Sequence, residues 1–303
     1  MQSIYAMHQN GSDSIEKEEK FLLYSIDNIL DLYLTMLSSL IEIGKKEAVF
    51  IEKSGQKHIT TSQERNPNKK FINNTILQIL SENNSLSIAL ENRKINHWEL
   101  NEDYIQILLD SIKNSNFYAK YMANTVNNFE EDKQFIITIF TDIIVPNDKF
   151  YEFLEDNNLT WIDDIPVVNT HIVKQLNSIK SIKDTSFTVP KIFKDQEDKE
   201  FVSDLFKKTV LNEVEFAKEF VDKTPNWDSE RIAELDTIVL KMAICEFLKF
   251  PSIPVKVTIN EYLEISKEYS TPKSSIFING ILDNLIKEFS TKNKLNKIGR
   301  GLM

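Results

Sequence analysis

Cysteine, glycine and proline are all scarce in this sequence of 303 residues. The single cysteine, Cys245, excludes an internal disulfide and any metal site built from several cysteines. Six glycines and eight prolines are too few for a β-sandwich or β-barrel, which needs a turn about every ten residues. An apolar fraction of 41% still provides enough material for a sizeable core. The composition therefore predicts an all-α globular protein.

Signals for membranes and for bulk nucleic-acid binding are also missing. No apolar run approaches the roughly 20 residues that span a bilayer, and Met1 to Asn10 do not resemble a signal peptide. The sequence has 36 basic and 46 acidic residues, and the formal charge of −10 argues against non-specific binding of nucleic acid. A lone cysteine is typical of a reducing compartment. We therefore expect a cytoplasmic protein without a membrane partner.

Motifs of catalysis and cofactor binding are absent from the sequence. There is no glycine-rich phosphate loop, and none of the four histidines stands in H-E-x-x-H spacing. The acidic clusters at 130–132 and 163–164 precede predicted helices, where the helix dipole favours acidic residues. Cys245 lies on an apolar helix face and is expected to act as a small hydrophobe. The sequence predicts no enzyme activity, no metal, no cofactor and no small-molecule substrate.

Apolar residues recur at helical spacing along most of the chain. They predict a helix over 15–43 with Tyr24 and Phe21 on its inward face, ended by Gly44 and followed by a mobile loop over 53–68. Further predicted helices cover 69–82, 102–115, 130–145, 147–157 and 164–179, and 183–198 reads as a connection. Two stretches, 45–70 and 287–303, are basic, and solvated loops or tails often have this composition.

The last hundred residues have the clearest helical pattern. Ile238, Val239, Met242 and Cys245 share a face of a helix that must end before Pro251. Thr258 and Glu261 form a capping-box pattern, and Thr271 followed by Pro272 predicts the start of a final helix. In that helix Phe277, Ile278, Ile281, Leu282 and Leu285 are predicted to face inward, and Gly280 predicts a close approach of another backbone.

The chain also shows a possible internal repeat with an offset of 66 residues. Between Asp132 and Ile179 nine of 48 positions are identical in the shifted sequence, including Phe150 on Phe216 and Trp161 on Trp227. Either a unit of helix, helix, tryptophan and helix is duplicated, or shared helical patterning produces the matches.

Three strings in the C-terminal third resemble the NusB family of transcription antitermination factors. They are Trp227-Asp-Ser-Glu-Arg-Ile232, Ile253-Pro-Val-Lys-Val-Thr-Ile-Asn-Glu261 and Phe277-Ile-Asn-Gly-Ile-Leu-Asp283. At the other end, Met1 to Tyr5 resembles the Gln-x-Leu-Tyr end of the family's first helix. The resemblance implies N-terminal NusB-like helices over 1–40, a helical insertion over 41–197 that includes the possible repeat, a NusB-like core over 198–290 and a basic tail over 291–303.

The resemblance further implies a bundle of two small helical subdomains and a role without catalysis. Family members bind the boxA element of nascent ribosomal RNA transcripts together with NusE, a small-subunit ribosomal protein, so that RNA polymerase resists termination. The matched positions for RNA are Gln2, Tyr5, Lys241, Lys273, Ser274, Phe277 and Asn279, and Asp236 matches a partner-binding position on an exposed helix face. Aromatic rings can stack on bases and lysines can meet phosphates. Phe277 and Asn279 could instead serve core packing and helix capping. Tyr5 could instead be a packed tyrosine of the core.

One feature of the family is missing from the sequence as given. In the family an arginine-rich segment precedes the Gln-x-Leu-Tyr motif and contacts RNA phosphates, whereas this sequence begins at Met1 inside the motif. Either Met1 is an internal methionine or the protein lacks the segment. Two hypotheses follow, an RNA-binding antitermination factor acting with NusE, and a helical adaptor that keeps the NusE-binding face without binding RNA.

Overall fold

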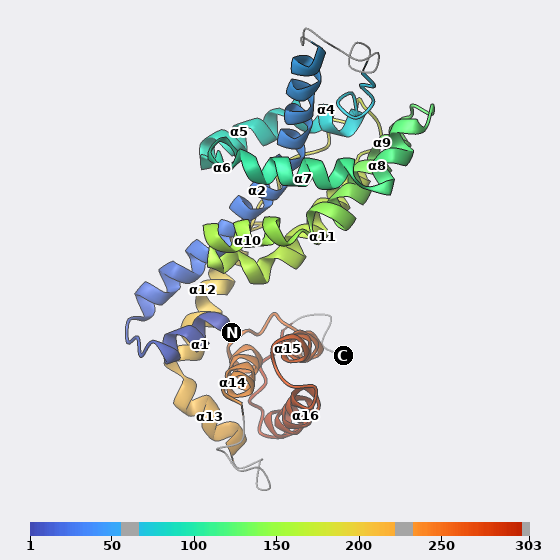
Figure 1. Ribbon diagram of the computed structural model, residues 1–303. Helices are drawn as coiled ribbons and strands as arrows, with labels where there is room; N and C mark the ends of the chain where they lie inside the picture. The colour runs from blue at the N-terminus through green and yellow to red at the C-terminus, as the bar shows by residue number, and fades with distance from the viewer. Residues whose placement is uncertain (56–66, 222–232, 299–303) are drawn as a thin grey trace. The chain divides into compact units, whose positions relative to one another are not determined.

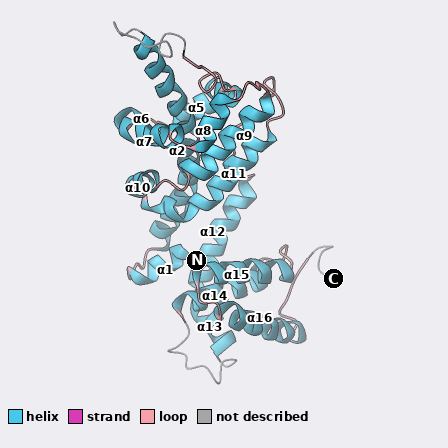
Figure 2. Cartoon of the chain, turned by 45° about the vertical axis from the view of Figure 1, so that its right-hand side comes forward, coloured by secondary structure: helices cyan, strands magenta, loops and turns pink. Residues whose placement is uncertain are grey.

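The computed structural model describes residues 1–55, 67–221 and 233–298, and within them the regular structure is helical throughout (Figures 1 and 2). These residues form fifteen α-helices, one π-helical turn and one 3-10 helix, with no strand among them. The all-α prediction is therefore confirmed. The chain divides into two compact units, which we call unit 1 (Met1–Tyr24 with Phe193–Met303) and unit 2 (Ser25–Ile192).

Unit 1 is organised around one buried helix, α14 (Glu234–Lys249). The other helices are α1 (Gln2–Gln9), residues 15–24 of α2 (Ile15–Gly55), α12 (Gln196–Leu211), α13 (Glu213–Val221), α15 (Val255–Tyr269) and α16 (Ser274–Thr291). Helix α14 packs against α1, α12, α13, α15 and α16. Because it has neighbours on nearly every side, its apolar residues are almost continuous from Ile238 to Phe247.

Unit 2 has a separate core of its own, to which α2 contributes Leu32, Met36, Leu37 and Leu40. The other elements are α4 (Thr75–Ser81), α5 (Asn84–Arg93), α6 (His97–Leu100), α7 (Glu102–Lys113), α8 (Asn116–Ala123), α9 (Phe129–Ile139), the π-turn η1 (Phe140–Ile144), α10 (Asp148–Asn157), the 3-10 helix η2 (Leu159–Asp164) and α11 (Ile165–Ser178). No described helix is long and apolar enough to cross a membrane.

Helix α2 differs from the helix predicted over 15–43. It continues through Gly44 to Gly55, because an isolated glycine inside a helix costs only about 1 kcal/mol. Gly44 lies where α2 meets α4, and a Cβ atom there would come within 3.1 Å of Leu77 Cδ1. Phe21 and Tyr24 are exposed rather than inward-facing. Residues 56–66 of the predicted loop lie outside the described residues.

Asparagine and serine caps divide the N-terminal half into more helices than the periodicity predicts. The predicted helix over 69–82 is wrong at its start, because the Asn74 side chain accepts a hydrogen bond from the Ile76 amide and α4 begins at Thr75. The helices α5 and α8, which no sequence pattern predicts, begin after the capping side chains of Asn83 and Ser115. Their apolar stripes are too short to stand out in the sequence.

Helix α14 ends at Lys249 as predicted, but three further predictions for this region are wrong. Thr258 lies inside α15 and donates a hydrogen bond to Glu246 Oε1 at 2.6 Å instead of capping a helix. Helix α16 begins after Lys273, and the Thr271 hydroxyl lies 2.9 Å from Ser274 Oγ. Apart from the backbone of α16 itself and the neighbours of Gly280, no atom of the described residues lies within 4 Å of the position of a Cβ at Gly280, so no described backbone of another element packs there.

The helix order is compatible with the 66-residue repeat. In unit 2, α9 with η1, α10 and α11 follow one another, and α12, α13 and α14 follow in the same order in unit 1. The aligned Phe150 and Phe216 are both fully buried, as are Ile172 and Ile238. Trp161 is buried in unit 2, whereas Trp227 lies outside the described residues. The duplication stays a prediction, as does the insertion over 41–197, whose first boundary falls inside α2.

Candidate nucleic-acid interface

Helix α1 anchors the first two matched residues on unit 1. Ile4 and Met7 of this helix are buried in the unit 1 core, and α1 packs against α14. The helical spacing leaves Gln2 exposed and Tyr5 38% exposed. A half-exposed tyrosine ring on a helix held by its buried face is suited to stacking on an unpaired base.

Lys241 of α14 lies in a polar cluster at the junction of α1, α13 and α14. Its Nζ is 2.7 Å from Glu213 Oε2, and only 12% of its side chain is exposed. Glu213 Oε1 is also 2.8 Å from His8 Nε2, and Gln9 Nε2 donates a hydrogen bond to Glu234 Oε2 at 2.7 Å. The lysine charge is therefore already balanced, and a phosphate would have to compete with Glu213.

Sequence reasoning missed His8 and Glu213 as neighbours of Lys241. They lie 205 residues apart, and Glu213 precedes Lys241 by 28 residues. No local spacing rule relates positions on three different helices, so only the packing of α1 and α13 on α14 brings them together.

Asp236 does not lie on an exposed helix face, and that part of the prediction is wrong. It is 4% exposed, and its Oδ1 has no hydrogen-bond partner among the described residues. Its place in the first turn of α14 explains how the charge is tolerated, because the positive end of the helix dipole favours a carboxylate there. The helices that pack around α14 bury a position that the sequence pattern leaves outside the apolar stripe.

The remaining matched residues gather at the start of α16. Lys273 is the exposed N-cap residue, and Ser274 is buried, with its hydroxyl 2.9 Å from those of both Ser270 and Thr271. Phe277 is half-buried against the unit 1 core, and Asn279 is also half-buried. Lys273 is therefore the most accessible charge of this group. The neighbouring Ile276 is 76% exposed and was not singled out by the sequence pattern.

The titratable residues considered for catalysis lie in separate environments. Burial raises the pKa of the Cys245 thiol to about 11. His97 packs edge-on against Phe153 and Trp161, and burial lowers its pKa. His58 lies outside the described residues. Across residues 1–55, 67–221 and 233–298, no group of three or more histidine, cysteine, aspartate or glutamate side chains could hold a metal ion.

The protein is all-α, and the matched residues lie on α1, on α14 and at the start of α16, all within unit 1. The family model described as the NusB family matches residues 169–287, and transcription antitermination proteins NusB are similar in sequence. The protein of Salinibacter ruber is 42% identical over 110 residues, which cover 36% of this chain and 68% of that protein. The chain belongs to the NusB family.

Other relatives match over segments of similar length. NusB of Chloroherpeton thalassium is 39% identical over 105 residues, covering 35% of this chain and 50% of that protein. NusB of Finegoldia magna is 43% identical over 88 residues, which cover 28% of this chain and 64% of that protein. A solved structure of T. maritima NusB aligns with a TM-score of 0.31 and 27% identity, covering 48% of this chain and 85% of that one.

Proposed function

We propose that this chain is a non-enzymatic factor of transcription antitermination that binds boxA-type RNA of nascent ribosomal RNA transcripts. In this proposal it acts together with NusE in an antitermination complex with RNA polymerase. The observation that carries the proposal is the 42% identity with an antitermination protein of the same family over 68% of that protein.

The accessible residues of unit 1 suggest how the RNA is held. Tyr5 stacks on an unpaired base and Lys273 meets a phosphate, while Gln2 and Asn279 offer amide groups to base edges. The half-buried Phe277 contributes its ring, Ser274 orients the start of α16 through its hydroxyl contacts, and Lys241 exchanges Glu213 for a phosphate.

Asp236 has an indirect role in this proposal. Because it is buried in the first turn of α14, it holds the surface that NusE binds rather than touching NusE with a free carboxylate. Asp236→Lys places an unpaired cation at the positive end of the helix dipole, so we expect it to weaken NusE binding.

A second candidate, an adaptor that binds NusE but not RNA, is favoured by the charges of the chain. The formal charge is −10, and the ion pair with Glu213 already neutralises Lys241. Phosphate contacts supply most of the sequence-independent affinity for RNA, so few free cations favour a protein partner.

Fluorescence anisotropy with a single-stranded boxA-type RNA, with and without NusE and across a salt series, separates the two candidates. We expect Lys273→Gln to reduce the slope of log affinity against log salt by about 0.7, the loss of one phosphate contact. Tyr5→Ala should weaken binding by roughly tenfold with the slope unchanged, since stacking releases no counterions.

Two matched variants serve as controls. Lys256→Gln removes an exposed lysine of α15, and Tyr151→Ala removes a tyrosine of α10 that is 41% exposed in unit 2; neither should change binding. Binding of NusE without binding of RNA at any salt concentration would favour the adaptor. Failure to bind either partner would overturn both candidates.

A further inference from the structure

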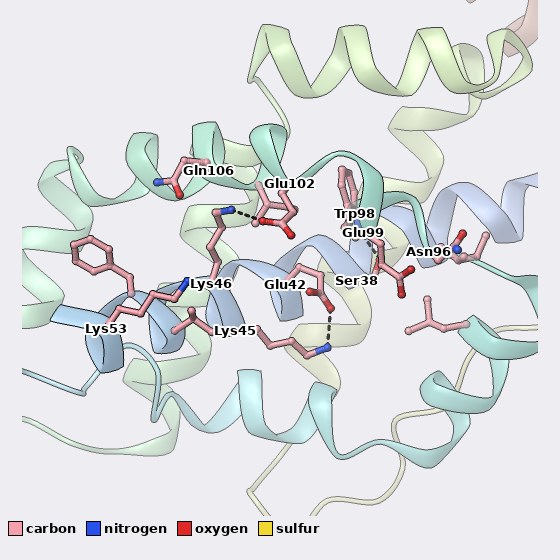
Figure 3. A pocket seen from close by; sticks show the side chains of 15 residues that line it. Ser38, Glu42, Lys45, Lys46, Lys53, Asn96, Trp98, Glu99, Glu102 and Gln106 are labelled. Atoms are coloured by element: carbon pink, nitrogen blue, oxygen red, sulfur yellow. Dashed lines mark hydrogen bonds and ion pairs between the residues drawn. The ribbon is translucent and has the colours of Figure 1, made fainter. Parts of the chain in front are cut away.

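Unit 2 contains a groove that none of the proposed RNA-binding residues lines. It has a volume of about 640 Å³ and lies between α2, the turn from α5 to α6, and α7 (Figure 3). We call it the α2–α7 groove. Its floor includes the buried Trp98 and Ile105, and Val49 and Phe50 at its edge are 47% and 55% exposed. The groove is therefore a partly apolar surface that no described residue covers.

The charges that line the groove have a definite order. Two ion pairs occupy its middle, Lys46 with Glu102 at 3.2 Å and Lys45 with Glu42 at 2.7 Å. Lys53 and Glu99 also line the groove, and no described residue forms an ion pair with either of them. Figure 3 shows Lys53 toward one end of the groove and Glu99 toward the other. The groove therefore has one basic end, one acidic end and a neutral centre.

The length of the groove follows from contacts along α2. Trp98 Nε1 donates a hydrogen bond to Ser38 Oγ at 3.0 Å, which fixes the end that carries Glu99 beside Ser38. Lys53 follows Ser38 by fifteen positions on the same helix, a distance of about 22 Å. An α-helix of about four turns has this length.

We propose that the α2–α7 groove binds one amphipathic α-helix of a partner protein. Apolar residues at i, i+3, i+4 and i+7 of that helix lie on Trp98, Ile105 and Val49, as in other helix-in-groove complexes. Its N-terminal turn is basic and faces Glu99, and its C-terminal turn is acidic and faces Lys53. The helix dipole has the same polarity, positive at the N-terminus and negative at the C-terminus. The groove is lined by three glutamates and three lysines, so it has no net positive charge to attract a nucleic acid.

Two synthetic helical peptides of equal composition test the direction of binding. The forward peptide has an apolar stripe, two lysines in its first turn and two glutamates in its last turn, and the reverse peptide exchanges these charges. Glutamates near the N-terminus stabilise an isolated helix, so the reverse peptide is the better helix in water. We expect the full chain to bind the forward peptide roughly five- to tenfold more tightly in fluorescence anisotropy, and helix formation alone would favour the opposite order.

Exchange of the two end charges provides the reciprocal test. The double variant Lys53→Glu with Glu99→Lys should reverse the preference between the peptides. Both side chains are exposed, so the double variant should fold like the original chain, which circular dichroism checks. Equal affinity for both peptides, or a preference that the exchange leaves unchanged, would overturn the proposal.

Substitution of the apolar edge completes the experiment. Val49→Asp should weaken binding of the forward peptide at least tenfold, whereas Val167→Asp, at a 67% exposed valine of α11 outside the groove, should leave it unchanged. A peptide with proline in its second turn should also fail to bind, because proline breaks the helix. Binding of a single-stranded oligouridine that depends on Lys53, without binding of either peptide, would assign the surface to RNA and overturn the proposal.

Discussion

Unit 1 and unit 2 each bury a carboxylate that accepts hydrogen bonds from a threonine and a tyrosine, but they have separate cores. In unit 1 the core surrounds α14, and Glu246 of that helix accepts hydrogen bonds from Thr258 Oγ1 at 2.6 Å and Tyr262 OH at 3.2 Å. In unit 2 the corresponding carboxylate is that of Asp132 in α9, which accepts hydrogen bonds from the Thr75 amide at 2.9 Å and from Tyr121 OH at 2.6 Å. Each carboxylate joins helices of its own unit only.

The comparison shows that a well buried core is present in both units, whereas the resemblance to the family is concentrated in unit 1. The family strings lie in unit 1, where α14 has neighbours on nearly every side and its sequence is constrained at nearly every position. Unit 2 has an equally well buried core, with no side chain shared with that of unit 1. We therefore expect the two units to unfold as separate cooperative transitions.

The largest effect should come from the two phenylalanines that the 66-residue offset aligns. Phe150→Ala and Phe216→Ala each remove a fully buried ring, at a cost of about 3–5 kcal/mol. In differential scanning calorimetry, Phe150→Ala should lower only the transition of unit 2 and Phe216→Ala only that of unit 1. If both variants lowered one common transition equally, the units would not be independent.

A smaller, pH-dependent effect should be confined to unit 2. Burial, with a second contribution from the charge of Asp163, raises the pKa of Asp164 from 3.8 to about 6. The protonated carboxyl therefore favours the folded state, and this contribution is complete below about pH 4 and lost as the pH rises through 6. Asp164 is only half-buried, so after screening Asp164→Asn should stabilise unit 2 by about 1 kcal/mol at pH 7 and little at pH 4.

Urea unfolding at the two pH values measures this difference. The transition of unit 1 is the internal control, because Asp164 belongs to unit 2 alone. An equal gain at pH 4 and pH 7 would mean that the asparagine acts through packing or helix capping rather than through removal of the charge.

The smallest effect compares one helical glycine from each unit. Gly280→Ala should stabilise unit 1 by about 0.5–1 kcal/mol, because α16 gains helix propensity and the added Cβ meets no atom within 4 Å. Gly44→Ala offers the same propensity gain, but its Cβ would come within 3.1 Å of Leu77 Cδ1. We expect a smaller gain or a small loss for unit 2. Thermal unfolding of both variants decides this, and equal gains would show that Leu77 moves aside freely.

The sequence predicts some helices closely and misses others. The helices α7, α10 and α11 follow the predicted ranges within one or two residues, because each has a sustained apolar stripe. In α15 the Thr258 pattern misleads, since the same hydroxyl that could cap a helix instead pairs with Glu246 from another helix. Local patterns do not record which of two possible hydrogen-bond partners tertiary packing will supply.

The predicted site residues show the same limit. The resemblance to the family singles out Lys241 and Asp236 as positions on one helix, but their exposure depends on the helices that pack around α14. The pairing of Lys241 with Glu213 and the burial of Asp236 could not be predicted, because the partners are distant in sequence.

By itself the sequence determined the helical class, through its scarcity of turn formers and its helical periodicity, and the resemblance to the NusB family, through strings that need no structure to be read. Tertiary structure alone decided which charged side chains form ion pairs and that α2 meets α4 at Gly44. It also decided that a partly apolar groove with one basic and one acidic end remains open among the described residues of unit 2. The reason is physical: periodicity is a property of one helix, whereas burial and pairing are properties of helices that meet from distant parts of the chain.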